Sequence, residues 1–67
     1  MGDEITLEEG WRLAIEKERE AQQFYKQLLE MTEDAALQSL LRFLADQEVS
    51  HEQLLQDEYD RMFMPEN

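Results

Sequence analysis

The segment Met31-Thr32-Glu33-Asp34 decides the fold, because it interrupts an otherwise almost continuous helical sequence. On both sides of it the chain is rich in Glu, Gln, Leu, Ala, Lys and Arg, which are good helix formers. Thr32 is a favourable N-cap, and Glu33 and Asp34 are expected to place negative charge in the first turn of a second helix. The segment therefore predicts a turn between two helices.

The first helix is predicted to span about residues 6–31, because Thr6 is followed three residues later by Glu9, the pattern of a capping box. The second helix is predicted to span about residues 33–63, since Pro65 forbids much continuation. A connection as short as this one makes the two helices antiparallel neighbours. The expected fold class is all-α, an antiparallel two-helix hairpin.

The chain is one small domain, residues 1–67, and its composition excludes several kinds of protein. It contains no cysteine, so disulfides and cysteine-based metal sites are impossible. Chains shorter than about 70–80 residues rarely stabilise a single core without a disulfide, a metal or oligomerisation, so we expect a metal, an oligomer or both. The net charge of -11 disfavours nucleic acid and membrane partners. With no apolar run that could span a membrane and no signal peptide pattern, a cytoplasmic location is expected.

Apolar residues recur at helical spacing along one face of each predicted helix, which marks the expected core. On the first helix they are Leu7, Trp11, Ala14, Ile15, Ala21, Tyr25, Leu28 and Leu29, and on the second Leu37, Leu40, Leu41, Leu44, Leu55 and Met62. Glu18 interrupts the first stripe, and Glu48 and His51 interrupt the second. Glu18 lies about fourteen residues before the turn and Glu48 about fifteen after it. In an antiparallel hairpin these three side chains should therefore converge at one level.

A buried carboxylate is costly to ionise without a partner, so two carboxylates and an imidazole together favour a shared cation. The alternative for Glu48 and His51 is a polar pair within a dimer seam. The alternative for Glu18 is a salt bridge to one of three cations: Lys17, Arg19 or the partner's Arg42.

The sequence resembles the ferritin-like di-iron carboxylate proteins, most of all rubrerythrin-like proteins and encapsulated ferritins. The resemblance rests on Glu18-Arg19-Glu20-Ala21-Gln22-Gln23-Phe24-Tyr25 followed by Glu48-Val49-Ser50-His51. Those families carry a Glu seven residues before a Tyr on one helix and Glu-x-x-His on the next. The turn Thr32-Glu33-Asp34-Ala35-Ala36-Leu37 also resembles theirs, and the similarity spans about residues 7–59.

The resemblance implies that this chain supplies half of a di-iron site. Full-length members have four helices, with a Glu from each of two helices and Glu-x-x-His from each of the other two. Two copies of this hairpin, related by a two-fold axis, would complete the six ligands and form a ferritin-like four-helix bundle. Glu48 would then bridge the metals, and Glu18 and His51 would be terminal ligands. We expect two iron ions per dimer, with manganese or zinc as alternatives that suit the same donors.

Three further residues have expected roles near this site. By resemblance, Tyr25 is a candidate catalytic residue that hydrogen-bonds a ligand or buffers an electron, with core packing as the alternative. Glu20 and Glu58 are candidate accessory cation sites, and the alternative for both is a solvated carboxylate.

The function implied by the resemblance is ferroxidase or iron-handling activity in a homodimer or higher homo-oligomer. One alternative is a rubrerythrin-like peroxide reductase whose electron donor acts in trans, because without cysteines there is no rubredoxin module. The other is a non-enzymatic acidic helical module that binds a protein partner. Iron storage would require an enclosing shell protein, and the segment 64–67 is too short to resemble the tail that directs encapsulated ferritins into a nanocompartment.

Overall fold

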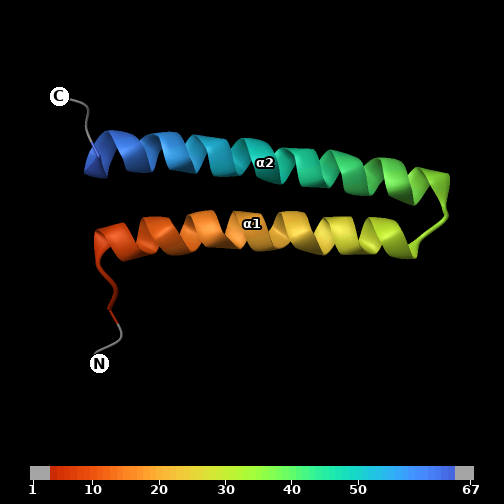
Figure 1. Cartoon of the computed structure of the whole chain (residues 1–67), viewed down its shortest axis with the longest axis horizontal. Coiled ribbons are helices and arrows are strands. Elements are labelled where there is room, and N and C mark those ends of the chain that lie inside the picture. Colours follow the sequence, from red (N-terminus) through yellow and green to blue (C-terminus); the bar gives the residue numbers. More distant parts are fainter. Residues whose placement is uncertain (1–3, 65–67) are drawn as a thin grey trace.

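The computed structural model describes residues 4–64, and within this range the chain is an α-helical hairpin without strands. Helix α1 spans Leu7–Met31 and helix α2 spans Ala35–Phe63. The helices lie side by side and antiparallel, so that the start of α1 and the end of α2 share one end of the molecule (Figure 1). We call this the open end, and the opposite end, where residues 32–34 connect the helices, the loop end. The predicted all-α hairpin is confirmed.

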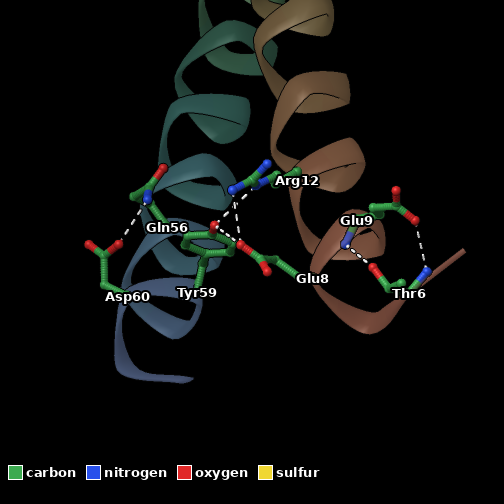
Figure 2. Close-up of polar contacts among 7 residues, drawn as sticks. All are labelled: Thr6, Glu8, Glu9, Arg12, Gln56, Tyr59 and Asp60. Atoms are coloured by element: carbon green, nitrogen blue, oxygen red, sulfur yellow. Dashed lines mark hydrogen bonds and ion pairs between the residues drawn. The ribbon is translucent and has the colours of Figure 1, made fainter. Parts of the chain in front are cut away.

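The start of α1 is fixed by the predicted capping box. The Thr6 hydroxyl oxygen accepts a hydrogen bond from the Glu9 backbone N–H at 3.0 Å, and Glu9 Oε1 accepts one from the Thr6 N–H at 2.9 Å (Figure 2). Two N–H groups that lack helical partners are satisfied in this way. Local sequence therefore determines where α1 begins.

The N-cap of α2 is Asp34, and the prediction that Thr32 caps this helix was wrong. Asp34 Oδ1 accepts from the Leu37 N–H at 2.8 Å, while the Thr32 hydroxyl accepts from the Asp34 N–H at 3.1 Å. The Thr32 carbonyl also accepts from the Gln38 side chain at 3.0 Å. Thr32 therefore organises the turn, and Glu33 and Asp34 precede the first turn of α2 rather than belonging to it.

The end of α2 lies at Phe63, and the Met64 N–H donates to the Asp60 carbonyl at 2.9 Å. Pro65, which was expected to stop the helix, and the rest of the segment 65–67 lie outside the described residues. Neither α1 nor α2 carries an apolar stretch that could cross a membrane.

The contact between the helices buries only three residues, Ile15, Leu41 and Tyr59. Most other members of the predicted stripes are half-buried, and four remain exposed: Leu7, Leu37, Leu40 and Met62. Their exposure has a geometric cause, since each helix of a lone hairpin has a single neighbour and can bury one narrow strip. A broad apolar face is left without a partner within residues 4–64.

Tyr59 ties the two helices together at the open end. Its hydroxyl donates to Glu8 Oε2 at 2.7 Å and accepts from Arg12 Nε at 3.0 Å, while Arg12 also pairs with Glu8 at 2.9 Å (Figure 2). The ring packs against Phe63 in a tilted arrangement, with centroids 5.0 Å apart. A tyrosine can be buried here because its hydroxyl has partners.

We predict that Asp34→Ala lowers the free energy of unfolding by about 1 kcal/mol, because the Leu37 N–H loses its acceptor. Asp34→Ser keeps an acceptor oxygen at the cap and should remain within a few tenths of wild type. Urea denaturation followed by circular dichroism, at one fixed protein concentration, measures both. An Asp34→Ala variant as stable as wild type would contradict the assignment of the cap.

Candidate metal centre

Glu18 of α1 and Glu48 and His51 of α2 converge on one point between the helices. Each offers one ligand atom, and these atoms all lie within 4.8 Å of one another. His51 Nδ1 is 3.3 Å from Glu48 Oε1 and 3.8 Å from Glu18 Oε2. Glu48 and His51 share a face of α2 because they are three residues apart, and the antiparallel register brings Glu18 to their level. The structure thus brings together the three residues predicted as ligands.

The group lies near the middle of both helices and opens to one side of the hairpin. The exposed fraction of the side chain is 18% for Glu48 and 24% for Glu18, but 51% for His51. The carboxylates are therefore set back between the helices, while the imidazole stands at the rim. A cation can reach all three side chains from the side of the hairpin on which His51 is exposed.

The two carboxyl groups perturb each other's protonation. Hydrogen bonding to Glu48, followed by partial burial and the charge of Glu48, raises the pKa of Glu18 above its ordinary value. The same hydrogen bond from Glu18, with a further one from His51, lowers the pKa of Glu48. Glu18 therefore holds its proton more tightly than Glu48 does. A metal ion that binds both groups displaces such a proton, because carboxylate ligands must be ionised.

The donor set fits a divalent transition metal. Two carboxylates and one imidazole are ligands that suit Fe(II), Mn(II) and Zn(II). His51 turns Nδ1 toward the two carboxyl groups, so all three donors face the same point. Three protein donors leave other coordination positions of the metal ion open, as expected where the remaining ligands come from another molecule.

Glu52 is a residue at this site that the sequence analysis missed. It follows His51, and its two oxygens accept from α1: Oε2 from Arg19 Nε at 2.6 Å and Oε1 from the Gln22 amide at 2.7 Å. These bonds lower the pKa of Glu52. Since Arg19 is next to Glu18, the contact fixes the register of the helices at the level of the three ligands. Glu52 lies at helical spacing from Glu48, but the chain has 17 acidic residues, so this spacing does not distinguish Glu52 from the others.

The other predicted site residues do not join this group. Glu20 pairs with Lys17 at 3.3 Å, and Glu58 pairs with Arg61 at 3.0 Å. The half-buried Tyr25 ring packs against Phe24, with centroids 5.6 Å apart. Two of the ion pairs considered for Glu18 are not formed in the hairpin. Lys17 pairs with Glu20, and Arg19 pairs with Glu52.

Comparison with known proteins agrees with this geometry. The sequence profile of the rubrerythrin family, described as Rubrerythrin, matches residues 3–59. The chain belongs to the rubrerythrin family. Searches of curated proteins and of solved structures found no match. Rubrerythrin-family proteins typically bind iron, and here the match covers a helical hairpin that holds two carboxylates and a histidine together. The family and the site together indicate an iron-binding, ferritin-like protein.

We predict that Glu52→Gln weakens metal binding by about 10-fold, because the helices lose their ion pair beside the ligands. Absorbance titration with Co(II), a spectroscopic stand-in for Fe(II), measures this affinity. Tyr59→Phe is the matched control, since it removes the other polar link between the helices, far from the ligands. It should destabilise the fold but leave Co(II) affinity within about twofold. Equal losses of affinity in both variants would contradict a positioning role for Glu52.

The same variant has an expected pH signature in stability. Because the pKa of Glu52 is lowered in the folded state, its ionised form stabilises the fold above the ordinary value of 4.5. This contribution disappears as the pH falls through the lower folded-state pKa. The difference in unfolding free energy between wild type and Glu52→Gln should therefore be about 0.5–1 kcal/mol at neutral pH and vanish in acid.

Proposed function

We propose that two copies of this chain form a di-iron site and oxidise Fe(II) there. The observation that carries the proposal is the convergence of Glu18, Glu48 and His51, whose ligand atoms lie within 4.8 Å. This is one Glu and one Glu-x-x-His, half of the six-ligand set of di-iron helical bundles. A second copy of the chain, related by a two-fold axis beside the group, would supply the other half of the ligands.

The surroundings of the group support a second copy as the source of the missing ligands. His51 stands at the rim of an otherwise apolar face, to which the exposed Leu37, Leu40 and Met62 belong. A face of this kind on so small a domain calls for a partner. When two such faces meet, they bury the apolar residues of four helices and bring both metal-ligand groups together.

Charge links dimerisation to metal binding. Each copy contributes two carboxylates, so a dimer holds four, which balance the charge of two divalent cations. Without cations, four carboxylates in one desolvated seam repel each other strongly. Metal binding should therefore stabilise the dimer, and dimerisation should raise metal affinity by the same factor.

Fe(II) is the substrate of the proposed reaction. Two Fe(II) ions each lose one electron, and one dioxygen molecule takes up the two electrons and two protons to become hydrogen peroxide. In the proposed arrangement Glu18, Glu48 and His51 of both copies would hold the two ions. Anionic oxygen donors stabilise the higher charge of Fe(III) more than that of Fe(II), which favours oxidation. The net charge of -11 concentrates cations around the site.

Native mass spectrometry with and without Fe(II) tests the shared site. We expect a dimer that carries two metal ions, together with little dimer when metal is absent. Glu48→Gln should lose both the metal and the metal-dependent dimer. Glu30→Gln, which removes an exposed carboxylate elsewhere on α1, should behave like wild type. A monomer that binds one ion by itself would overturn the proposal.

A stopped-flow assay tests the chemistry. Aerobic addition of Fe(II) should raise the near-ultraviolet absorbance of ferric carboxylate species in wild type and Glu30→Gln, but not in a Glu48→Ala, His51→Ala double variant. Equal rates in wild type and the double variant would end the ferroxidase proposal. Reaction with peroxide that runs well ahead of oxygen would instead assign the peroxide reductase activity, in which hydrogen peroxide takes up two electrons and two protons to give water.

A further inference from the structure

Tyr59 is a buried tyrosine whose hydroxyl faces a proton acceptor. Only 8% of its surface is exposed, and Figure 2 shows its hydroxyl between the side chains of Glu8 and Arg12. The hydroxyl donates to Glu8 Oε2 at 2.7 Å, a length typical of a hydrogen bond from a hydroxyl to an ionised carboxylate. A phenol loses an electron more readily when a base can take its proton in the same step. The bond to Glu8 therefore prepares Tyr59 for oxidation.

Arg12 holds this acceptor in place. Its Nη2 pairs with Glu8 Oε2 at 2.9 Å, and its Nε donates to the Tyr59 hydroxyl oxygen at 3.0 Å. The guanidinium group thus fixes the carboxylate against the phenol and balances its charge. The exposed fraction of the Glu8 side chain is 43%, so a proton that Glu8 accepts can pass on to water. The buried phenol has a short route to solvent for its proton.

Tyr59 also lies on the inner face of α2, as the metal ligands do. It is eleven residues, about three turns, after Glu48 and eight residues after His51. At the helical rise of 1.5 Å per residue, its backbone is about 12 Å from that of His51. Electrons tunnel through a protein over such a distance, whereas a proton moves only between groups in contact. An electron from Tyr59 can therefore reach the ligand group while its proton goes to Glu8.

We propose that Tyr59 is a one-electron donor to the metal site and that Glu8 accepts its proton. This inference rests on the ferroxidase function proposed above and adds electrons for the hydrogen peroxide that this reaction forms. Hydrogen peroxide takes up one electron from Tyr59 of each copy and two protons from solvent, its O–O bond breaks, and two water molecules result. Each Tyr59 becomes a neutral phenoxyl radical beside a protonated Glu8.

The proton acceptor distinguishes Tyr59 from Tyr25, the residue expected to buffer an electron. Tyr25 is seven residues after Glu18, about 10 Å along α1, so distance to the ligand group separates the two tyrosines little. The Tyr25 ring packs against Phe24. Within residues 4–64, the hydrogen bond from a tyrosine hydroxyl to a carboxylate is that of Tyr59. Its phenol is the one arranged to release an electron and a proton together.

Photo-oxidation of the metal-free chain tests the pair of Tyr59 and Glu8 without iron. The chain has two tyrosines, so Tyr25→Phe leaves Tyr59 as the sole one. A flash-generated Ru(III) tris-bipyridine complex serves as the one-electron oxidant, and transient absorbance follows the tyrosyl radical. We expect a rate constant that does not change with pH around neutrality, because Glu8 rather than water takes the proton. A rate constant that rises with pH in this protein would overturn the inference.

In the same background, Glu8→Gln removes the proton acceptor and keeps the size of the side chain. Oxidation should slow by about 100-fold, the lower end of the effect of a positioned proton acceptor, and should now speed up as the pH rises. Glu16→Gln is the matched control, since it removes an exposed carboxylate two turns further along α1. It should oxidise like the parent. Equal rates in the two variants, with circular dichroism showing intact helices, would contradict the role of Glu8.

Electron paramagnetic resonance tests donation to the loaded site. Rapid freezing of the Fe(II)-loaded dimer after mixing with oxygen should trap a tyrosyl radical that is lost in Tyr59→Phe and kept in Tyr25→Phe. Tyr59→Phe should also release more hydrogen peroxide for each Fe(II) oxidised. A radical lost instead in Tyr25→Phe, or equal peroxide release from wild type and Tyr59→Phe, would overturn the donation.

Failure of this inference and failure of the proposed function remain distinguishable. Iron oxidation at the wild-type rate without a radical on Tyr59 would leave the ferroxidase function intact and overturn only the electron donation. Iron oxidation no faster than in the Glu48→Ala, His51→Ala double variant would overturn both.

Discussion

Two carboxyl groups, those of Glu18 and Glu48, lie side by side between two helices, and this contact constrains the rest of the structure. Hydrogen bonding between the two carboxyl groups is the largest cause of both shifts: it raises the pKa of Glu18 and lowers that of Glu48. In a single chain the neighbouring His51 Nδ1 approaches both carboxyl groups. A metal ion would stabilise the pair further, because the imidazole and the two carboxylates already face one point.

The polar links between the helices hold this contact in register. At the level of the ligands, Glu52 binds Arg19 and Gln22, and at the open end Tyr59 binds a glutamate and an arginine of α1. Apolar packing is sparse by comparison, since among residues 4–64 only Ile15, Leu41 and Tyr59 are buried. A hairpin so lightly packed has little to set its register except these links. The apolar face beside the ligands is then free for the second copy that the proposed site requires.

Much of the fold and of the candidate site could be predicted because the signals are local or periodic. Helical periodicity placed Glu18, Glu48 and His51 on the inner faces, and antiparallel counting from the turn brought them to one level. The cap of α2 was mispredicted because Thr32 and Asp34 are both good caps, and only their hydrogen bonds separate them. Glu52 was missed because a cross-helix ion pair depends on the rotation of both helices, which a sequence so rich in glutamate does not reveal.

The sequence by itself determined the helices, the capping box at Thr6, the turn and the faces on which the polar interruptions lie, because propensity, capping and period act within a few residues. Only the tertiary structure decided which atoms meet: the approach of His51 Nδ1 to both carboxylates, the anchoring of Glu52, and the burial of Tyr59. Those features depend on the rotation of each helix about its own axis and on the distance between the two helices. No local rule of sequence sets either quantity.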